Sequence, residues 1–149
     1  MSDRMSDASA MRIVLDTNVL VAAARSRRGA SYALLSSLPH ARFEPVVSVP
    51  LFLEYRDLLL RPENLFQRPA AQAEGFLDFL LSVRRLQKIF FFWRPALPDP
   101  DDDLILELAV AGGCRYIVTH NLRDFRGVEK WGVTAVTPSD FLKLIRKNT

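Results

Sequence analysis

The feature that most constrains this chain is the alternation of short apolar runs with longer stretches of helical spacing. Short apolar runs are typical of strands buried on both faces, and such strands belong to parallel sheets covered by helices. We therefore predict an α/β fold, a three-layer α/β/α sandwich with a mainly parallel five-stranded sheet. The predicted strands are residues 12–16, 45–49, 89–93, 116–119 and 133–136.

Proline, glycine and serine positions help to place the helices between these strands. Pro50 stands where a helix would begin, a position that tolerates proline well, and this helix is expected to end before Pro62. The glycine pair at 112–113 predicts the end of another helix, and Ser139 is expected to cap the last one. Residues 61–69 are predicted to form a loop. The other predicted helices are residues 18–25, 31–38, 70–86, 104–111 and 140–146.

The length of 149 residues suits one domain, and we expect a flexible tail at 1–10 followed by a single domain at 11–149. No apolar run approaches the roughly 20 residues that span a bilayer, so no membrane association is expected. The first ten residues lack an apolar signal core, and the single cysteine, Cys114, fits a reducing cytoplasm. Two histidines and one cysteine are too few for a structural zinc site.

Acidic residues follow several of the predicted strands. Asp16 ends the first strand, and Glu54 lies in the first turns of the helix after the second. Asp102 and Asp103 open the helix that leads to the fourth strand, and Asp124 comes shortly after that strand. Because the carboxyl ends of parallel strands meet at one edge of a sheet, these side chains are expected to converge there.

Each acid alone also has an ordinary structural interpretation. Asp16 could end a strand, Asp102 or Asp103 could cap a helix, Glu54 could face solvent and Asp124 could form a turn. Together they indicate more, because converging carboxylates repel one another unless a cation joins them. Hard ions such as Mg²⁺ and Mn²⁺ bind oxygen ligands and serve phosphate chemistry. A set of carboxylates without histidine or cysteine therefore predicts metal-assisted phosphodiester hydrolysis.

Two segments of the chain resemble the motifs of a known family. The run Val14-Leu15-Asp16-Thr17-Asn18-Val19-Leu20 is similar to the opening motif of PIN domains. The stretch from Asp102 to Phe125, with its Thr-x-Asn-x-x-Asp-Phe ending, resembles the second half of toxin-type (VapC-like) PIN domains, the ribonucleases of type II toxin–antitoxin systems. The resemblance extends from Met11 to Ile145 and implies a PIN-like fold.

The resemblance also implies the site residues. One or two Mg²⁺ or Mn²⁺ ions would be held by acids, and the third acid is one of Asp101, Asp102 and Asp103. Counting from Ile105 favours Asp102, whereas counting back from Thr119 favours Asp103. Asn121 stands where some relatives carry an aspartate. The implied catalytic residues are Asp16, Glu54, Asp102 and Asp124, with Asp103 as a further metal ligand and with Thr17, Asn18, Ser48 and Asn121 in support.

An RNA substrate also needs cationic and aromatic partners. The arginines expected to bind its phosphates are Arg25, Arg27, Arg28 and Arg123, although ordinary surface charge explains each of them equally well. Tyr32 and Tyr55 could stack on bases, and His120 lies near the proposed edge, where a structural role is the expected one.

The predicted function is metal-dependent RNA hydrolysis, and the resemblance implies the toxin of a toxin–antitoxin pair. The implied partners are RNA, a cognate antitoxin and a second copy of the chain, which would pair through the helix of Glu54 or the helix at 70–86. The alternative is a degenerate PIN scaffold that binds RNA or a protein without cutting, which Asn121 favours. A phosphatase of the haloacid dehalogenase type is disfavoured because that family has an aspartate where this chain has Asn18.

Overall fold

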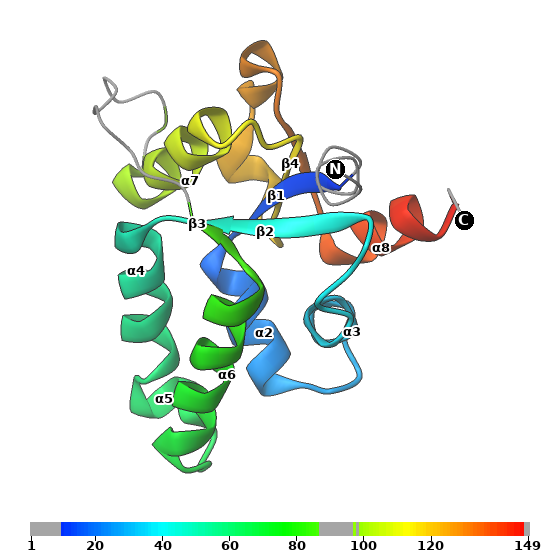
Figure 1. The fold of residues 1–149 in the computed structure, drawn as a ribbon. Coiled ribbons are helices and arrows are strands. Elements are labelled where there is room, and N and C mark those ends of the chain that lie inside the picture. The colour runs from blue at the N-terminus through cyan, green and yellow to red at the C-terminus, as the bar shows by residue number, and fades with distance from the viewer. Residues whose placement is uncertain (1–9, 87–96, 98, 148–149) are drawn as a thin grey trace.

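The computed structural model describes residues 10–86, 97 and 99–147 (Figure 1). The predicted tail at 1–10 lies outside these residues except for its last residue, and the predicted strand at 89–93 lies wholly outside them. Among the helices described, none is both long enough and apolar enough to cross a membrane.

The centre of the fold is a parallel sheet of five strands, as the alternating sequence pattern predicts. β1 (Met11–Leu15) lies in the middle and pairs with β2 on one side and β4 on the other. All four pairings are parallel. In spatial order the strands are β3 (Arg85–Leu86), β2 (Phe43–Val47), β1, β4 (Tyr116–Val118) and β5 (Thr134–Val136).

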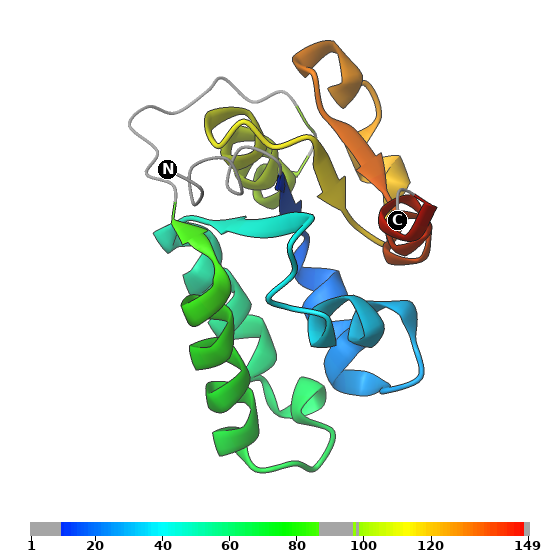
Figure 2. The same ribbon diagram turned by 45° about the vertical axis from the view of Figure 1, so that its right-hand side comes forward.

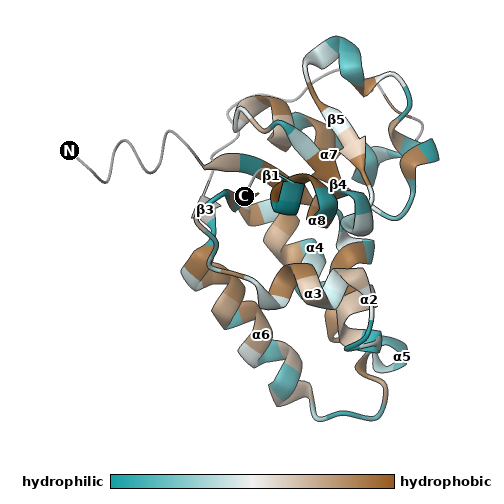
Figure 3. Cartoon of the chain, turned by 90° about the vertical axis from the view of Figure 1, so that its right-hand side faces the viewer, coloured by the Kyte–Doolittle hydropathy of each residue, from teal (hydrophilic) through white to brown (hydrophobic). Residues whose placement is uncertain are grey.

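Helices cover both faces of this sheet (Figure 1). Helix α7 lies on one face, while α2, α3 and α8 lie on the other. Helices α4 and α6 run side by side away from the sheet (Figure 2), and the short, largely hydrophilic α5 lies at their far end (Figure 3). The helices are α2 (Thr17–Arg25), α3 (Ala30–Ser36), α4 (Val49–Leu59), α5 (Pro62–Leu65), α6 (Ala70–Val83), α7 (Pro100–Ala111) and α8 (Pro138–Lys147), with 3₁₀ turns η1 (Leu122–Phe125) and η2 (Val128–Trp131).

The strand order reverses direction between β1 and β4. The chain builds β1, β2 and β3 toward one edge and then returns to add β4 and β5 on the other side of β1. Crossover connections leave the sheet on opposite faces at such a point, and the strand ends there border a crevice that binds ligands in open α/β sheets. Asp16 follows β1 and Thr119 follows β4, so both residues stand at this crevice.

Several predicted boundaries were wrong because local capping decides where a helix begins. The second strand ends at Val47 rather than residue 49, since Ser48 caps α4 by accepting a hydrogen bond from the Leu51 amide (3.2 Å). The acidic helix begins at Pro100, a turn earlier than predicted, because Asp99 is its cap. The last helix is capped by the Thr137 hydroxyl and not by Ser139.

Two further predictions failed in the segment between β2 and α7. The predicted helix at 70–86 ends at Val83, and its last residues instead form β3, which pairs with Val46 and Val47 of β2. The predicted loop at 61–69 contains the helical turn α5, which begins at Pro62. The predicted stop at 112–113 is confirmed, since Gly112 caps α7 and Gly113 follows with a φ of 64°.

Aromatic packing holds α8 against the sheet. Phe141 is fully buried, and its ring lies edge-on to Phe43 of β2 (5.2 Å between centroids) and to Tyr116 of β4 (5.8 Å). Because β2 and β4 flank β1, this helix braces the three central strands whose ends carry the polar residues described next.

Candidate active site

Asp16 is a buried carboxylate at the crevice, only 8% exposed. It follows β1 and caps α2, accepting a hydrogen bond from the Thr17 amide (2.8 Å) at Oδ1. Its Oδ2 accepts hydrogen bonds from the Thr119 hydroxyl (2.7 Å) and from the Asn18 side-chain amide (3.2 Å). Three donors therefore hold this carboxylate in one orientation and favour its charged form.

A second group of hydrogen bonds ties the end of β4 to the start of α2. The Asn18 side chain donates to the Thr119 hydroxyl (3.4 Å) and accepts from the His120 amide (3.2 Å). The backbone amide of Asn121 also donates to the Thr119 hydroxyl (2.9 Å). Thr119 was not among the site residues predicted from the sequence, although its position directly after a predicted strand could have identified it.

Glu54 reaches the site from α4, and its neighbour Tyr55 fixes the position of that helix. Tyr55 is completely buried, and its hydroxyl donates to the carbonyl oxygen of Leu15, the residue before Asp16. The prediction that Tyr55 stacks on bases was therefore wrong. Glu54 Oε2 is a buried oxygen that has no hydrogen-bond partner among the described residues, although the Glu54 carboxyl as a whole interacts with the side chain of Asp101.

The aspartates of α7 point in different directions. The charges of Asp124 and Asp16 both act on Asp102. Asp101 acts on Glu54 through its charge and also through a side-chain hydrogen bond. The side chain of Asp103 is turned elsewhere, since its Oδ1 accepts a hydrogen bond from the Leu97 amide (2.8 Å). Asp102 therefore lies with the other acids, whereas Asp103 binds the backbone of Leu97.

Burial and mutual repulsion raise the pKa values of these acids. Burial raises the pKa of Asp16, and hydrogen bonds from Thr119 and Thr17 oppose that rise. Burial, followed by the charge of Asp101, raises the pKa of Glu54 to about 7. Burial, followed by the charges of Asp124 and Asp16, raises the pKa of Asp102 to about 7. The cluster therefore carries more negative charge than its surroundings balance.

No basic side chain among the described residues forms an ion pair with Asp16, Glu54, Asp102 or Asp124. Ion pairs of the described residues lie elsewhere, such as those that join Arg12 to Glu44, Arg56 to Glu74 and Arg61 to Asp57. An excess of carboxylate oxygens, one of them buried without a partner, fits a hard divalent cation. Within the described ranges no three of these groups are already gathered around one point, so cation binding requires the side chains to draw together.

The other predicted supporting and substrate-binding residues lie on several different elements. Ser48 is buried at the start of α4, and Asp124 and Arg123 lie in η1, where Arg123 is exposed. Arg25 and Arg28 are exposed at and after the end of α2.

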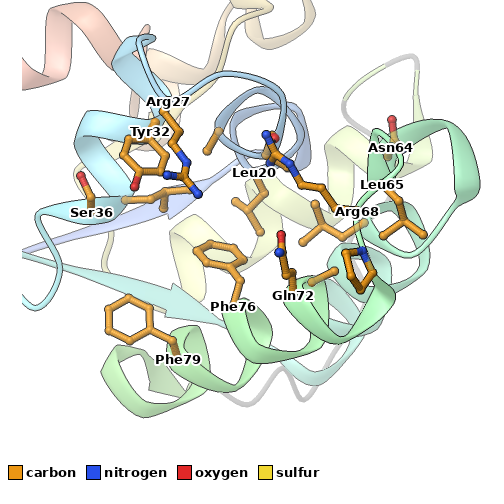
Figure 4. A pocket seen from close by; sticks show the side chains of 16 residues that line it. Leu20, Arg27, Tyr32, Ser36, Asn64, Leu65, Arg68, Gln72, Phe76 and Phe79 are labelled. Atoms are coloured by element: carbon orange, nitrogen blue, oxygen red, sulfur yellow. The ribbon is translucent and has the colours of Figure 1, made fainter.

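Arg27 lies apart from the cluster, on a groove between the helices that point away from the sheet (Figure 4). Leu20, Tyr32 and Phe76 contribute to its largely apolar lining, and Arg27 and Arg68 supply the cationic groups. Arg27 was predicted to bind RNA phosphates and Tyr32 to stack on bases. Both line this groove, which contains none of the four acids.

Comparison with known proteins gives a family and a fold. A family model described as PIN domain matches residues 12–123. A solved structure of VapBC-1 from nontypeable Haemophilus influenzae aligns with a TM-score of 0.59 at 16% identity, over 87% of this chain and 99% of that one. A structure of VapBC2 from Rickettsia felis bound to a promoter DNA fragment aligns with a TM-score of 0.57 at 18% identity, over 85% and 98%. No curated protein matches. At these identities the structural likeness supports the fold alone.

Proposed function

Since the chain belongs to the PIN domain family, we propose that it is a metal-dependent ribonuclease that hydrolyses RNA phosphodiester bonds. The observation that carries this proposal is the group of uncompensated carboxylates at the reversal point of the sheet. Such a group needs a cation, and a cation bound there faces the crevice where ligands of open α/β sheets bind. We further propose that the protein is the toxin of a toxin–antitoxin pair.

Asp16, Glu54, Asp102 and Asp124 are the proposed holders of one or two Mg²⁺ or Mn²⁺ ions. When bound, the metal lowers the pKa of a water molecule and neutralises charge that develops on the phosphate. Asp16 is the central ligand because three hydrogen bonds already orient it. Asp101 stands beside Glu54 and adds negative charge to the same side of the site.

The chain's own residues provide positioning and take up a proton. Thr119 and Asn18 hold Asp16 in place, and the hydroxyl of Tyr55 holds α4 against Leu15, which sets the distance of Glu54 from Asp16. Since no separate base stands at the site among the described residues, a carboxylate of the cluster or bulk water accepts the proton of the attacking water.

The proposed partners are an antitoxin and a second copy of the chain. Both solved structures above are described as VapBC, and an antitoxin that offers an arginine to the carboxylates would block the substrate site. Val49 and Leu53 are 60% and 57% exposed on one side of α4, which supports pairing of two copies through this helix. The buried free thiol of Cys114 suits the reducing cytoplasm in which we place the protein.

The competing function is a scaffold that binds RNA or a protein without cutting. Asn121 favours it, because an amide can bind a cation through its oxygen but adds no charge to a second metal site. The raised pKa values of Glu54 and Asp102 favour the nuclease, because a scaffold gains nothing from repelling carboxylates.

Cleavage of an end-labelled structured RNA tests the proposal. The purified protein is assayed with Mn²⁺, with Mg²⁺ and with EDTA, beside Asp16→Asn and the control Asp78→Asn, which changes an exposed aspartate of α6. We expect cutting that requires the metal, disappears in Asp16→Asn and persists in Asp78→Asn. Cutting that survives in EDTA, or equally in both variants, would refute the proposed site.

A further inference from the structure

A second cavity, of about 510 Å³, adjoins the carboxylate cluster along α2. Asn18 belongs to both places, because it lines this cavity and donates a hydrogen bond to Asp16 (3.2 Å). Among the described residues, no acidic side chain lines this cavity, whereas the neighbouring cluster consists of carboxylates. The lining residues are Thr17, Asn18, Val21, Ala22, Arg25, Leu58 and His120.

His120 is held at the wall of this cavity by a buried partner. Its ring nitrogen Nε2 lies 2.7 Å from the hydroxyl of Ser31, which is 2% exposed. Its backbone amide donates to the Asn18 side chain (3.2 Å). When the serine hydroxyl donates to Nε2, Nδ1 carries the ring hydrogen, and no described residue is hydrogen-bonded to Nδ1. In that tautomer the imidazole is held by Ser31 and keeps one ring N–H donor that can bind a ligand.

Thr17 and Arg25 supply two further donors. The Thr17 hydroxyl is buried, in a residue 6% exposed, and has no hydrogen-bond partner among the described residues. A buried hydroxyl without a partner is costly unless a ligand satisfies it. The exposed guanidinium of Arg25 lies 5.4 Å from the ring centre of Phe66 and forms no ion pair with a carboxylate in the described part of the chain. These donors can bind an anion in the cavity.

We propose that this cavity binds the phosphate that neighbours the scissile phosphate on the same RNA strand, with His120 and Arg25 as the phosphate-binding residues. The inference rests on the ribonuclease function proposed above. A strand whose scissile phosphate lies at the carboxylates carries its next phosphate only one nucleotide away. This cavity adjoins the carboxylates and has His120 and Arg25 among its lining residues. Contacts to phosphate set the register of a strand without reading its bases. This cavity therefore contributes affinity and alignment, not sequence preference.

Binding without cleavage tests the assignment. In an Asp16→Asn background with EDTA, the anisotropy of a labelled single-stranded RNA gives the dissociation constant. Loss of a charge-assisted hydrogen bond predicts about tenfold weaker binding for His120→Ala and for Arg25→Ala. Arg25→Ala is also expected to reduce the salt dependence of RNA affinity by the amount that corresponds to about one phosphate contact. Ser31→Ala, which frees the imidazole, should weaken binding by a smaller factor.

Controls separate this site from general surface charge. Lys143→Ala removes an exposed cation from α8, which carries none of the cavity's residues, and should leave RNA affinity unchanged. His120→Asn retains a donor at the place of Nδ1 and should bind more tightly than His120→Ala. Equal affinities for Arg25→Ala, His120→Ala and Lys143→Ala would overturn the inference. The inference would also be overturned if His120→Ala and Arg25→Ala weakened the binding of a poly-glutamate peptide but not the binding of RNA. That result would assign the cavity to an acidic protein partner.

Kinetics distinguish the failure of this inference from the failure of the proposed function. In the otherwise unchanged chain with Mn²⁺, His120→Ala and Arg25→Ala should raise KM and leave kcat nearly unaltered. If the unchanged chain cuts RNA and both variants keep its KM, only the inference fails. If the unchanged chain cuts nothing, the proposed function fails, and the binding measurement still decides whether the cavity takes a phosphate.

Discussion

The hydroxyl of Thr119 donates a hydrogen bond of 2.7 Å to Asp16 Oδ2 and so joins the ends of two neighbouring strands, β4 and β1. Both residues are buried, Thr119 completely. The hydrogen bond opposes the rise in the pKa of Asp16 that burial causes, and it sets the carboxylate at the point where the sheet order reverses.

Replacing Thr119 with valine keeps the shape of the side chain but removes this donor. We expect Thr119→Val to lower the free energy of unfolding by about 1–3 kcal/mol and to reduce metal-dependent RNA cleavage about tenfold. Urea unfolding and cleavage rates measure the two effects. Thr134→Val, at an exposed position of β5, is the matched control. Equal behaviour of the two variants would show that the hydroxyl of Thr119 does not serve the site.

The stability of the metal-free protein should fall as the pH rises from about 4 to above 7. The folded-state pKa values of Glu54 and Asp102 are raised from 4.5 and 3.8 to about 7, so folding favours their protonated forms. Their contribution to stability is complete below the unfolded values and is lost as the pH rises through about 7. Urea unfolding in EDTA between pH 4 and pH 8 checks this. Glu54→Gln should make the fall of stability with pH less steep. A steeper fall in Glu54→Gln than in the unchanged chain would argue against repulsion within the cluster.

Added Mn²⁺ should raise the melting temperature, because the ion binds the folded carboxylates and not the unfolded chain. At one hundred times the dissociation constant the gain is about 2.7 kcal/mol. Asp102→Asn should abolish the rise, whereas Asp103→Asn should keep most of it, since Asp103 is bonded to the Leu97 amide. The reverse order would make Asp103 the third acid. Mn²⁺ could leave the melting temperature unchanged while Asp16→Ala itself raises it. In that case the carboxylates repel one another without binding a metal.

Tyr55→Phe tests whether α4 is positioned through its bond to Leu15. Loss of this buried hydrogen bond should cost about 1 kcal/mol of stability. Because Glu54 is the preceding residue, cleavage should slow more than the stability loss alone explains. Tyr32→Phe, in the apolar groove, is the control. Unchanged cleavage in a destabilised Tyr55→Phe would limit this hydroxyl to a structural role.

Much of this fold follows from local patterns in the sequence. The short apolar runs predicted the parallel sheet, and the position of each acid relative to a strand predicted which edge would carry charge. The boundaries at Val47 and Pro100 were missed because a serine and an aspartate cap the helices there, and a cap competes with the strand or loop pattern around it. β3 was missed because its pairing with Val46 and Val47 is a tertiary contact that periodicity does not show.

The residues of the site were also predictable from the sequence only in part. The sequence placed Asp16, Glu54, Asp102 and Asp124 after their strands, but it left the third acid ambiguous. Only side-chain direction separates Asp102 from Asp103, since the two neighbours lie in one turn of α7 and face different groups. The serine that holds His120 could not be identified from the sequence either, because Ser31 and His120 lie 89 residues apart.

Calorimetric titration of Mn²⁺ at pH 7, in two buffers of different ionisation enthalpy, tests the central claim most directly. Glu54 and Asp102 have pKa values of about 7, so metal binding should release protons from them and the measured heat should depend on the buffer. We predict binding of one or two ions with proton release, loss of binding in Asp16→Asn and unchanged binding in Asp78→Asn. Absence of binding in the unchanged chain, or equal binding in both variants, would contradict a metal site at these carboxylates.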